Sequence, residues 1–486
     1  MSSMPLRLIP VVTLVLVAAA LAFALRGAER DAGARGASPG AGAGSASAKP
    51  PKNVVLISLD TLRADHLGAW GYERETSPRI DAFAKKSVIF RRAVAQAGST
   101  IPSHASLFTS LYPSAVLTKP TLIQGPSGKG AAKLRGTLAD WPETLAEHLR
   151  NAGFATWGFV DGGNVRRDFG FAQGFDHYAD EGVGIEVLGK QARKWIEEHP
   201  VDRFFLFLHC YDIHTPYVSP DEYVALFGDP EHAYPMPLHA DYFRQVESGE
   251  IVMSERDFVE VIARYDAGIR YTDDRIGAFL DWLGERGLLD DTLVVIVSDH
   301  GEEMREHGRF GHEQLYLDPN LRVPLVIRAP GARPQVVGET VELVDVVPTI
   351  LDLLGLPASR DAIGRSLAPV VRGADQIDGA RAAFAEIGAG RKSQRTLVDD
   401  RWQLLVDPRK KTRRLYDLVA DPTASSDLAG SHGEVADRLE RELEERHGEA
   451  RTLAAERSPK HERKRKPKRL RRDVQRELEA LGYIQR

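Results

Sequence analysis

The chain has 486 residues, of which 43% are hydrophobic, so it can bury a large core and form one large domain with a smaller one. Its formal net charge of −5 is too small to indicate a class of partner by itself. Its single cysteine, Cys210, excludes an intrachain disulfide and a cysteine-rich metal site.

The N-terminal residues 1–26 are predicted to be a targeting segment. Residues 8–25 carry no charge and follow Arg7, a length between that of a signal-peptide core and that of a membrane-spanning helix. Cleavage as a signal peptide and retention as a membrane anchor are both open. The Gly/Ala/Ser-rich residues 27–52 then form a linker. We expect an exported protein, periplasmic or anchored with its bulk facing the periplasm or exterior.

Short apolar runs alternate with amphipathic stretches through residues 53–372, the expected catalytic domain. Helical periodicity marks 141–152 and 257–286, while other runs have the character of buried strands. The alternation predicts an α/β/α sandwich around a mostly parallel sheet. Ligands in such sheets bind beyond the carboxyl ends of the strands. Strands are expected at 53–59, 155–160, 204–209, 292–298 and 323–328.

A small C-terminal antiparallel α+β subdomain is expected at 373–430, where three short strand patterns precede a fourth apolar stretch. Residues 431–486 become helical and charged, with nine Lys or Arg among residues 460–472. A solvated tail is the simpler interpretation. A patch for anionic lipid or another polyanionic envelope surface is the alternative. We do not expect nucleic acid as a partner of an exported chain.

Residues 100–110 place a hydroxyl directly ahead of a short predicted helix. Pro102 suits a first helical turn, because its missing N–H would be unpaired there anyway. The hydroxyl of Thr100 would then face the free amides and partial positive charge of the helix end. This position favours an oxyanion or a phosphate-like group.

Acidic residues follow two of the predicted core strands. Asp60 comes after the first strand, and Asp299 and His300 come after the fourth, at the sheet edge where a site is expected. Buried carboxylates need a partner, and a divalent cation suits two carboxylates and an imidazole. Zn or Mn fits this donor set better than Ca, although Ca stays open. We expect one divalent metal ion to be held by Asp60, Thr100, Asp299 and His300.

Two loops present histidines beside these candidate ligands. His209 ends a predicted strand and His214 follows it in a loop, while His307 and His312 follow Asp299. Histidines next to ligand acids are better explained as substrate binders or proton donors than as isolated surface residues. We favour such roles for His214 and His312. For His209 and His307, substrate binding and a structural role are equal alternatives.

The chain carries a series of short motifs at 53–65, 102–109, 298–302, 322–324, 344–352, 364–367, 415–417 and 421–422. In this order they resemble the sulfatase family of the alkaline-phosphatase superfamily, over about residues 52–425. The closing motif at 481–483 is similar to one in bacterial members. The resemblance implies the fold predicted above, a metal-dependent ester hydrolase and a nucleophile at position 100. It also places His104 at a substrate-binding position.

Several positions depart from the family pattern. Thr100 stands where sulfatases carry a cysteine, or less often a serine, that is oxidised to formylglycine, and Ser99 is one residue out of register. His104 replaces an arginine, and Thr61 replaces an acid that binds metal. The histidine-glycine pair often found after the motif is missing beyond 112–113. A threonine nucleophile with this ligand set resembles phosphotransferases that move phosphoethanolamine or phosphoglycerol head groups in bacterial envelopes.

The leading hypothesis is therefore a metal-dependent hydrolase or phosphotransferase that acts on a phosphate ester through Thr100. An alkoxide attacks phosphorus readily, whereas a sulfated threonine would have no easy route of release. A sulfatase proper, which cleaves a sulfate ester through Thr100 by an unconventional route, is the second hypothesis. A binding protein that kept the fold and lost turnover is the third, suggested by the changes at Thr61 and His104.

Overall fold

The structure is a computed structural model, and every described residue belongs to the second of two units, Met1–Ala48 and Lys49–Arg486. The targeting segment, nearly all of the linker and most of the basic run 460–472 lie outside the described residues. Within the described part, no helix is both long and apolar enough to cross a bilayer. The described residues are 49–118, 122–124, 131–133, 136–379, 381–388, 393–459, 471, 474, 476–478 and 481.

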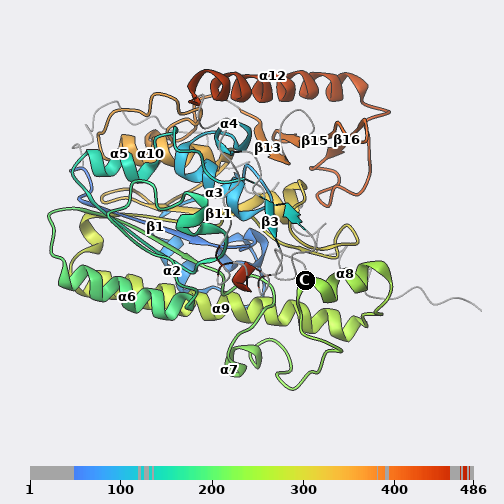
Figure 1. Cartoon of the computed structure of the whole chain (residues 1–486), viewed down its shortest axis with the longest axis horizontal. Coiled ribbons are helices and arrows are strands. Elements are labelled where there is room, and N and C mark those ends of the chain that lie inside the picture. Colours follow the sequence, from blue (N-terminus) through green and yellow to red (C-terminus); the bar gives the residue numbers. More distant parts are fainter. Residues whose placement is uncertain are drawn as a thin grey trace, which may run out of the picture. The chain divides into compact units, whose positions relative to one another are not determined.

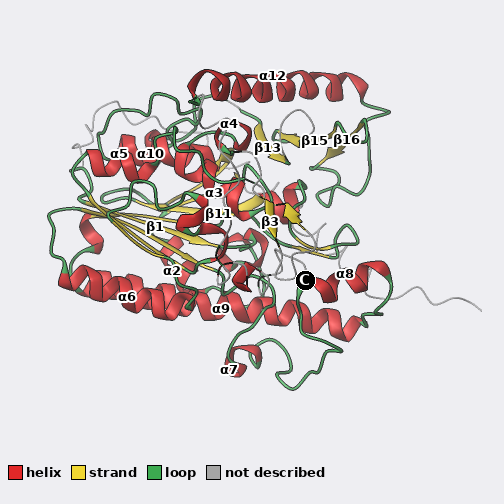
Figure 2. Ribbon diagram, viewed as in Figure 1, coloured by secondary structure: helices red, strands yellow, loops and turns green. Residues whose placement is uncertain are grey.

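Eight strands form a central sheet: β1 (Asn53–Leu59), β2 (Val88–Val94), β5 (Ala155–Val160), β6 (His177–Ala179), β7 (Phe204–Cys210), β8 (Thr292–Val297), β11 (Arg322–Arg328) and β12 (Gln335–Glu342). Their order across the sheet is β12-β2-β11-β8-β1-β7-β5-β6. Figure 2 shows the sheet in yellow between helices in red. Neighbouring strands run parallel, apart from the two pairs that include β11. The strands β1, β7 and β8 are buried along their whole length, which explains their continuous apolar character.

Helices cover both faces of this sheet (Figure 1). One face packs into a core with α3 (Thr100–Thr109), α5 (Leu145–Asn151), α10 (Val346–Leu353) and α12 (Gly433–Arg457). The other face packs with α2 (Pro78–Ala84), α6 (Gly184–Glu198), α8 (Ala240–Ser248) and α9 (Glu255–Glu285). These layers confirm the predicted α/β/α sandwich with a mostly parallel sheet.

Helix boundaries follow the capping residues. Helix α5 begins at Leu145, four residues later than periodicity alone predicts, because Thr144 and Glu147 form a capping box. Short elements connect the larger ones: α4 (Pro113–Val116), α7 (Asp221–Val224), α11 (Ala368–Val371), β3 (Leu122–Gln124), β4 (Ala131–Lys133), β9 (Glu303–Met304), β10 (Phe310–Gly311), η1 (Ala64–His66), η2 (Gly68–Trp70), η3 (Gly163–Val165), η4 (Arg167–Phe169), η5 (Leu289–Asp291), η6 (Leu317–Leu321) and η7 (Leu343–Asp345).

A second, smaller sheet lies in the C-terminal part of the chain. Its four antiparallel strands are β13 (Ala383–Ile387), β14 (Gln394–Val398), β15 (Trp402–Asp407) and β16 (Thr412–Asp417). Buried apolar residues of this sheet and of α12 belong to the same core as the first face of the large sheet. The two sheets therefore share one hydrophobic core.

Candidate functional site

The predicted metal-binding residues meet at the carboxyl edge of the large sheet. Asp60 follows β1 and Asp299 and His300 follow β8, and these two strands are parallel neighbours. Thr100 begins α3 at the same edge. All four residues have no exposed surface. The fold thus brings together side chains that lie up to 240 positions apart, from Asp60 to His300.

The ring of His300 lies at the centre of this group. Its Nε2 atom is 3.4 Å from Thr100 Oγ1, 3.4 Å from Asp299 Oδ2 and 4.0 Å from Asp60 Oδ1. One ligand atom each from Asp60, Asp299 and His300 lies within 4.8 Å of the other two. These spacings allow the three side chains, with the Thr100 hydroxyl, to hold a single ion.

The electrostatics of the two carboxyl groups also fit a cation. Burial raises the pKa of Asp60 well above its usual range, and the nearby Asp299 and Glu302 raise it further, while a hydrogen bond with Thr100 lowers it. Burial would raise the pKa of Asp299 as well, but the rings of His300 and His104 lower it below its usual range. A divalent ion between the two carboxylates would neutralise their negative charge and offset the cost of burying them. The residues therefore fit such an ion.

His104 belongs to α3, one turn after Thr100, and has no exposed surface. Its Nδ1 atom is 3.0 Å from the Thr100 carbonyl oxygen and 3.3 Å from Asp299 Oδ2. Because both of these oxygens accept, Nδ1 is the donor. Its Nε2 atom is 3.0 Å from the Ser58 hydroxyl. The ring therefore connects β1, the candidate nucleophile and the Asp299 carboxylate.

His209 lies on the other side of Asp60. It occupies the end of β7, has no exposed surface, and places Nε2 3.3 Å from Asp60 Oδ2. Burial lowers the pKa of this ring well below its usual range, and the His104 ring lowers it further. His209 is therefore neutral at physiological pH and contacts a metal-ligand candidate directly.

His214 and His312 form a pair beside His300. Their Nε2 atoms are 3.2 Å apart, and the rings of His312 and His300 are 4.8 Å apart. The Nδ1 atom of His214 donates to the Thr215 carbonyl oxygen at 2.6 Å, so its Nε2 lone pair faces His312. Burial lowers the pKa of His214 to about 4, and the ring is neutral near pH 7. His312 is partly exposed and lies on the accessible side of the pair.

His307 is not part of this cluster. Its Nδ1 atom is 2.9 Å from Glu303 Oε1, and its Nε2 atom is 2.9 Å from the Thr423 carbonyl oxygen. The ring also stacks on Tyr316 at a centroid distance of 3.6 Å. These contacts hold the strand β9 against the segment that follows β16, as expected for a residue with a structural role.

Two buried residues near the acids were not singled out from the sequence. Ser58 lies in β1 two positions before Asp60, which follows the strand, so the strand periodicity could have placed both on one face. Glu302 has no exposed surface, and burial raises its pKa to about 8 although Tyr217 and Arg63 lower it. Nothing in the local pattern distinguishes Glu302 from the exposed acids of a turn.

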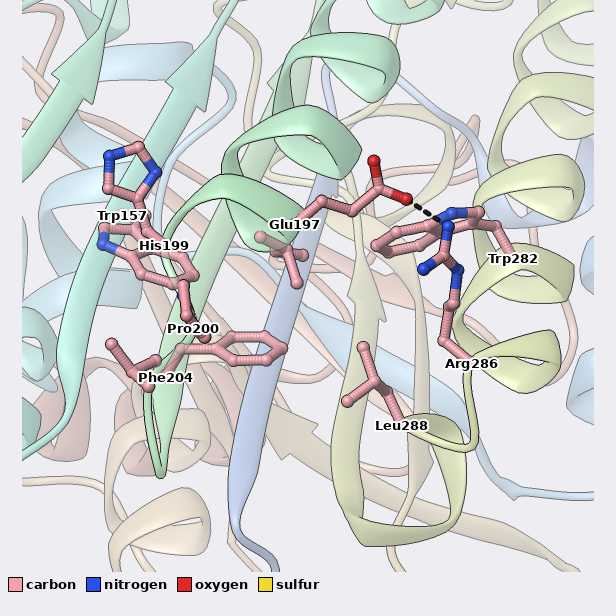
Figure 3. Close-up of a pocket in the computed structure, with 10 residues that line it drawn as sticks. Trp157, Glu197, His199, Pro200, Phe204, Trp282, Arg286 and Leu288 are labelled. Carbon is pink, nitrogen blue, oxygen red and sulfur yellow. Dashed lines mark hydrogen bonds and ion pairs between the residues drawn. The ribbon is translucent and has the colours of Figure 1, made fainter.

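A pocket of about 290 Å³ lies at the opposite end of the sheet, near the start of β7. Trp157, Phe204 and Trp282 form much of its lining, and Figure 3 shows the ion pair between Glu197 and Arg286 beside them. The parallel strands direct their carboxyl ends away from this pocket. It is therefore separate from the acid and histidine cluster.

Two family models match most of the chain. A model described as Sulfatase matches residues 52–356. A second, described as N-sulphoglucosamine sulphohydrolase, C-terminal, matches residues 305–449. Together these regions contain all of the metal-ligand candidates and all six histidines discussed above.

Individual relatives include enzymes with different names. The chain is 24% identical to an arylsulfatase of Clostridium perfringens over 458 residues, covering 78% of this chain and 90% of that protein. It is 27% identical over 397 residues to the multifunctional alkaline phosphatase superfamily protein PehA of Trinickia caryophylli, covering 65% of this chain and 76% of that protein. The phosphonate monoester hydrolase of Agrobacterium radiobacter has a similar fold, with a TM-score of 0.66, 21% identity, and coverage of 83% of this chain and 96% of that one.

Proposed function

The chain belongs to the sulfatase family, and from this premise we propose that it is a metal-dependent hydrolase or phosphotransferase that cleaves a phosphate ester through Thr100. Membership makes it a hydrolase of the sulfatase and alkaline-phosphatase superfamily. The choice of phosphate over sulfate and the identity of the nucleophile are our proposal. The observation that carries it is the Thr100 hydroxyl at the start of α3, 3.4 Å from His300 and in contact with Asp60.

We assign the metal to Asp60, Thr100, Asp299 and His300, with Zn or Mn preferred over Ca by the mixed oxygen and nitrogen donors. When bound, a divalent ion lowers the pKa of the coordinated hydroxyl and neutralises charge on the transferred group. His209 and His104 orient the two carboxylates through their contacts at 3.3 Å. The N-terminus of α3 adds partial positive charge where the phosphate oxygens would lie.

The proposed reaction has two steps. The Thr100 hydroxyl gives up its proton to water, Oγ1 forms a bond to phosphorus, the bond from phosphorus to the ester oxygen breaks, and the leaving oxygen takes a proton. The oxygen of water or of an acceptor alcohol then forms a bond to phosphorus and gives up its proton to the group that protonated the leaving oxygen. The bond from phosphorus to Thr100 Oγ1 breaks, and Oγ1 is released. We propose that His312 donates the proton to the leaving oxygen, because its ring lies 4.8 Å from the His300 ring and is partly exposed, whereas the His214 ring is buried.

The side chain of Thr100 favours phosphorus over sulfur. Formylglycine hydrate expels sulfate through its second hydroxyl, and threonine has a β-methyl group in that place. A sulfated Thr100 would therefore accumulate. The similar fold of a protein named as a phosphonate monoester hydrolase, and the relative named as a multifunctional alkaline phosphatase superfamily protein, are consistent with this preference.

Sulfate ester hydrolysis is the second candidate. It is favoured by the sulfatase family model and by the coverage of 90% of the arylsulfatase relative. The two candidates differ in the adduct that forms on Thr100 and in whether this adduct turns over.

A labelling experiment tests the proposal. The protein is purified with Mn²⁺ or Zn²⁺, incubated with p-nitrophenyl phosphate or p-nitrophenyl sulfate, quenched in acid and digested. We expect a phosphate adduct on the peptide that contains Thr100, and release of p-nitrophenol that Thr100→Ala abolishes. Because phosphate and sulfate adducts have nearly equal masses, radioactive phosphorus or sulfur identifies the group. Turnover of the sulfate ester alone would favour the second candidate. Bound metal without any turnover across phosphoester and sulfate-ester substrates would favour a binding protein.

We also propose that the protein acts outside the cytoplasm, which the charge-free residues 8–25 support. The substrate would then be a phosphoester of the cell envelope. The basic run 460–472 supports contact with anionic lipid. Cell fractionation of the full chain and a variant lacking residues 8–25 tests export.

A further inference from the structure

The last described residues return to the large sheet after α12. Val474 and Leu478 have no exposed surface and belong to the core on the first face, and Leu481 packs against it. The Leu481 amide donates to the Glu477 carbonyl oxygen at 3.0 Å, as in one helical turn. In Figure 1 this short red segment lies apart from α12.

The carboxylate of Glu477 binds the segment 162–166, which follows β5 at the carboxyl edge of the sheet. Oε1 accepts a hydrogen bond from the Gly163 amide, and Oε2 accepts one from the Arg166 guanidinium. The Arg166 side chain is 8% exposed, so this ion pair is largely shielded from solvent. Gly162 has a φ of 66°, and a Cβ atom there would come within 2.0 Å of Glu477 Oε1. The segment therefore accommodates this carboxylate through its glycines.

The same segment contacts the active-site histidines through Tyr211. The Asn164 amide donates to the Tyr211 hydroxyl at 2.9 Å. The Tyr211 ring meets the His209 ring edge-on at 4.7 Å and the His214 ring at 5.6 Å. His209 in turn contacts Asp60 at 3.3 Å. Direct contacts thus lead from the C-terminal segment to a metal-ligand candidate.

Anchoring of the C-terminal segment does not account for this arrangement. Val474 and Leu478 already hold the segment by complete burial of their side chains. A carboxylate that served as an anchor would be equally effective on any arginine of the surface. Besides Arg166, Glu477 binds a backbone amide, one residue before the amide that holds Tyr211.

We propose that Glu477 is a positioning residue for the active site. By holding residues 162–166 it fixes Tyr211, and through Tyr211 it fixes the rings of His209 and His214. The matched family regions end at residues 356 and 449, so this residue lies beyond both. The effect on turnover rests on the proposed function, whereas the effect on the two rings does not.

The test compares Glu477→Gln with Arg457→Gln in the full chain. Arg457 also forms an ion pair in the C-terminal part of the chain, with Asp361 rather than with the segment 162–166. Histidine-selective isotope labelling resolves ring signals by NMR, and His209→Gln and His214→Gln assign two of them. We expect the His209 and His214 signals to shift in Glu477→Gln and to stay unchanged in Arg457→Gln.

Kinetics provide the second measurement. With p-nitrophenyl phosphate and Mn²⁺, we expect Glu477→Gln to lower kcat about tenfold with little change in KM, as for other residues that orient ligand side chains. Unchanged ring signals, or a loss of kcat equal to that of Arg457→Gln, would overturn the proposal. An inactive wild type would refute the proposed function, and the ring signals would still decide the role of Glu477. If Glu477→Gln does not fold, Arg166→Lys replaces it in the same comparison.

Discussion

Replacing His104 with phenylalanine distinguishes a ring that orients Asp299 from one that touches the substrate. Phenylalanine keeps a planar ring of similar size. The site already surrounds this ring with Phe108, Phe171 and Phe207, at centroid distances of 6.5, 6.1 and 6.2 Å. Packing is therefore largely conserved, and the change removes the two ring nitrogens.

The expected magnitude follows from the contacts that these nitrogens make. The buried Ser58 hydroxyl loses its partner at 3.0 Å, which costs about 1–3 kcal/mol. The contact with the Asp299 carboxylate at 3.3 Å contributes about 1.5–3 kcal/mol. The Thr100 carbonyl keeps its helical hydrogen bond. We expect the free energy of unfolding to fall by about 2.5–6 kcal/mol. We expect kcat to fall roughly 10–100-fold with KM unchanged, because the ring orients a ligand and has no exposed surface.

Urea unfolding and steady-state kinetics with p-nitrophenyl phosphate measure both effects. His307→Phe is the matched control, because it removes two ring contacts at 2.9 Å outside the cluster and should lower stability without lowering kcat. A higher KM with unchanged kcat in His104→Phe would refute our reasoning and favour the substrate contact that the sequence suggested. Unchanged kcat and KM would also refute it.

Three further predictions concern the nucleophile, the metal and a buried acid. Thr100→Ala should abolish turnover while Thr100→Ser retains part of it, as measured by p-nitrophenol release. Equal activity of the two variants would exclude the Thr100 hydroxyl as the nucleophile. Chelation should lower the melting temperature, and Mn²⁺ at 100 times its Kd should restore about 2.7 kcal/mol of stability. An unchanged melting curve would contradict the assigned metal ligands. Burial raises the pKa of Asp273 from 3.8 to about 7, although it accepts the Arg79 and Ile80 amides. Its folded state binds a proton more tightly, so the contribution of Asp273 to stability should fall by about 3 kcal/mol from pH 4 to pH 7. In urea unfolding, Asp273→Asn should reduce the dependence of stability on pH by this amount. An equal pH dependence in the wild type and the variant would refute the raised pKa of Asp273.

The strands and the acids could be predicted because they depend on local patterns. Residues 54–57 and 59 are apolar, so both faces of this strand carry apolar side chains, as a strand covered on both sides requires. Asp60 and Asp299 follow such strands directly, and parallel strands bring their carboxyl ends to one edge. The position of Thr100 at a helix start followed from Pro102 in the first turn.

The partners of the histidines could not be predicted in the same way. His104 and His307 are both preceded by ordinary helix or loop patterns, yet one meets Asp299 in the core and the other meets Thr423 near the surface. These contacts depend on the order of strands across the sheet, which no periodicity encodes. Two further features also depend on the three-dimensional arrangement and could not be predicted. They are the antiparallel direction of β11 and the contact of Glu477 with Gly163, 314 positions away.

The position of β1 in the middle of the sheet has a consequence for biosynthesis. This strand pairs with β7 and β8, whose first residues are 151 and 239 positions later in the chain. During translation both of its edges stay unpaired until those segments have been made, and its apolar residues can pair with other nascent chains. At an elongation rate of about 5–20 residues per second, this interval lasts on the order of ten seconds or more. We therefore expect production of the folded protein to benefit from a factor that covers the unpaired strand during this time.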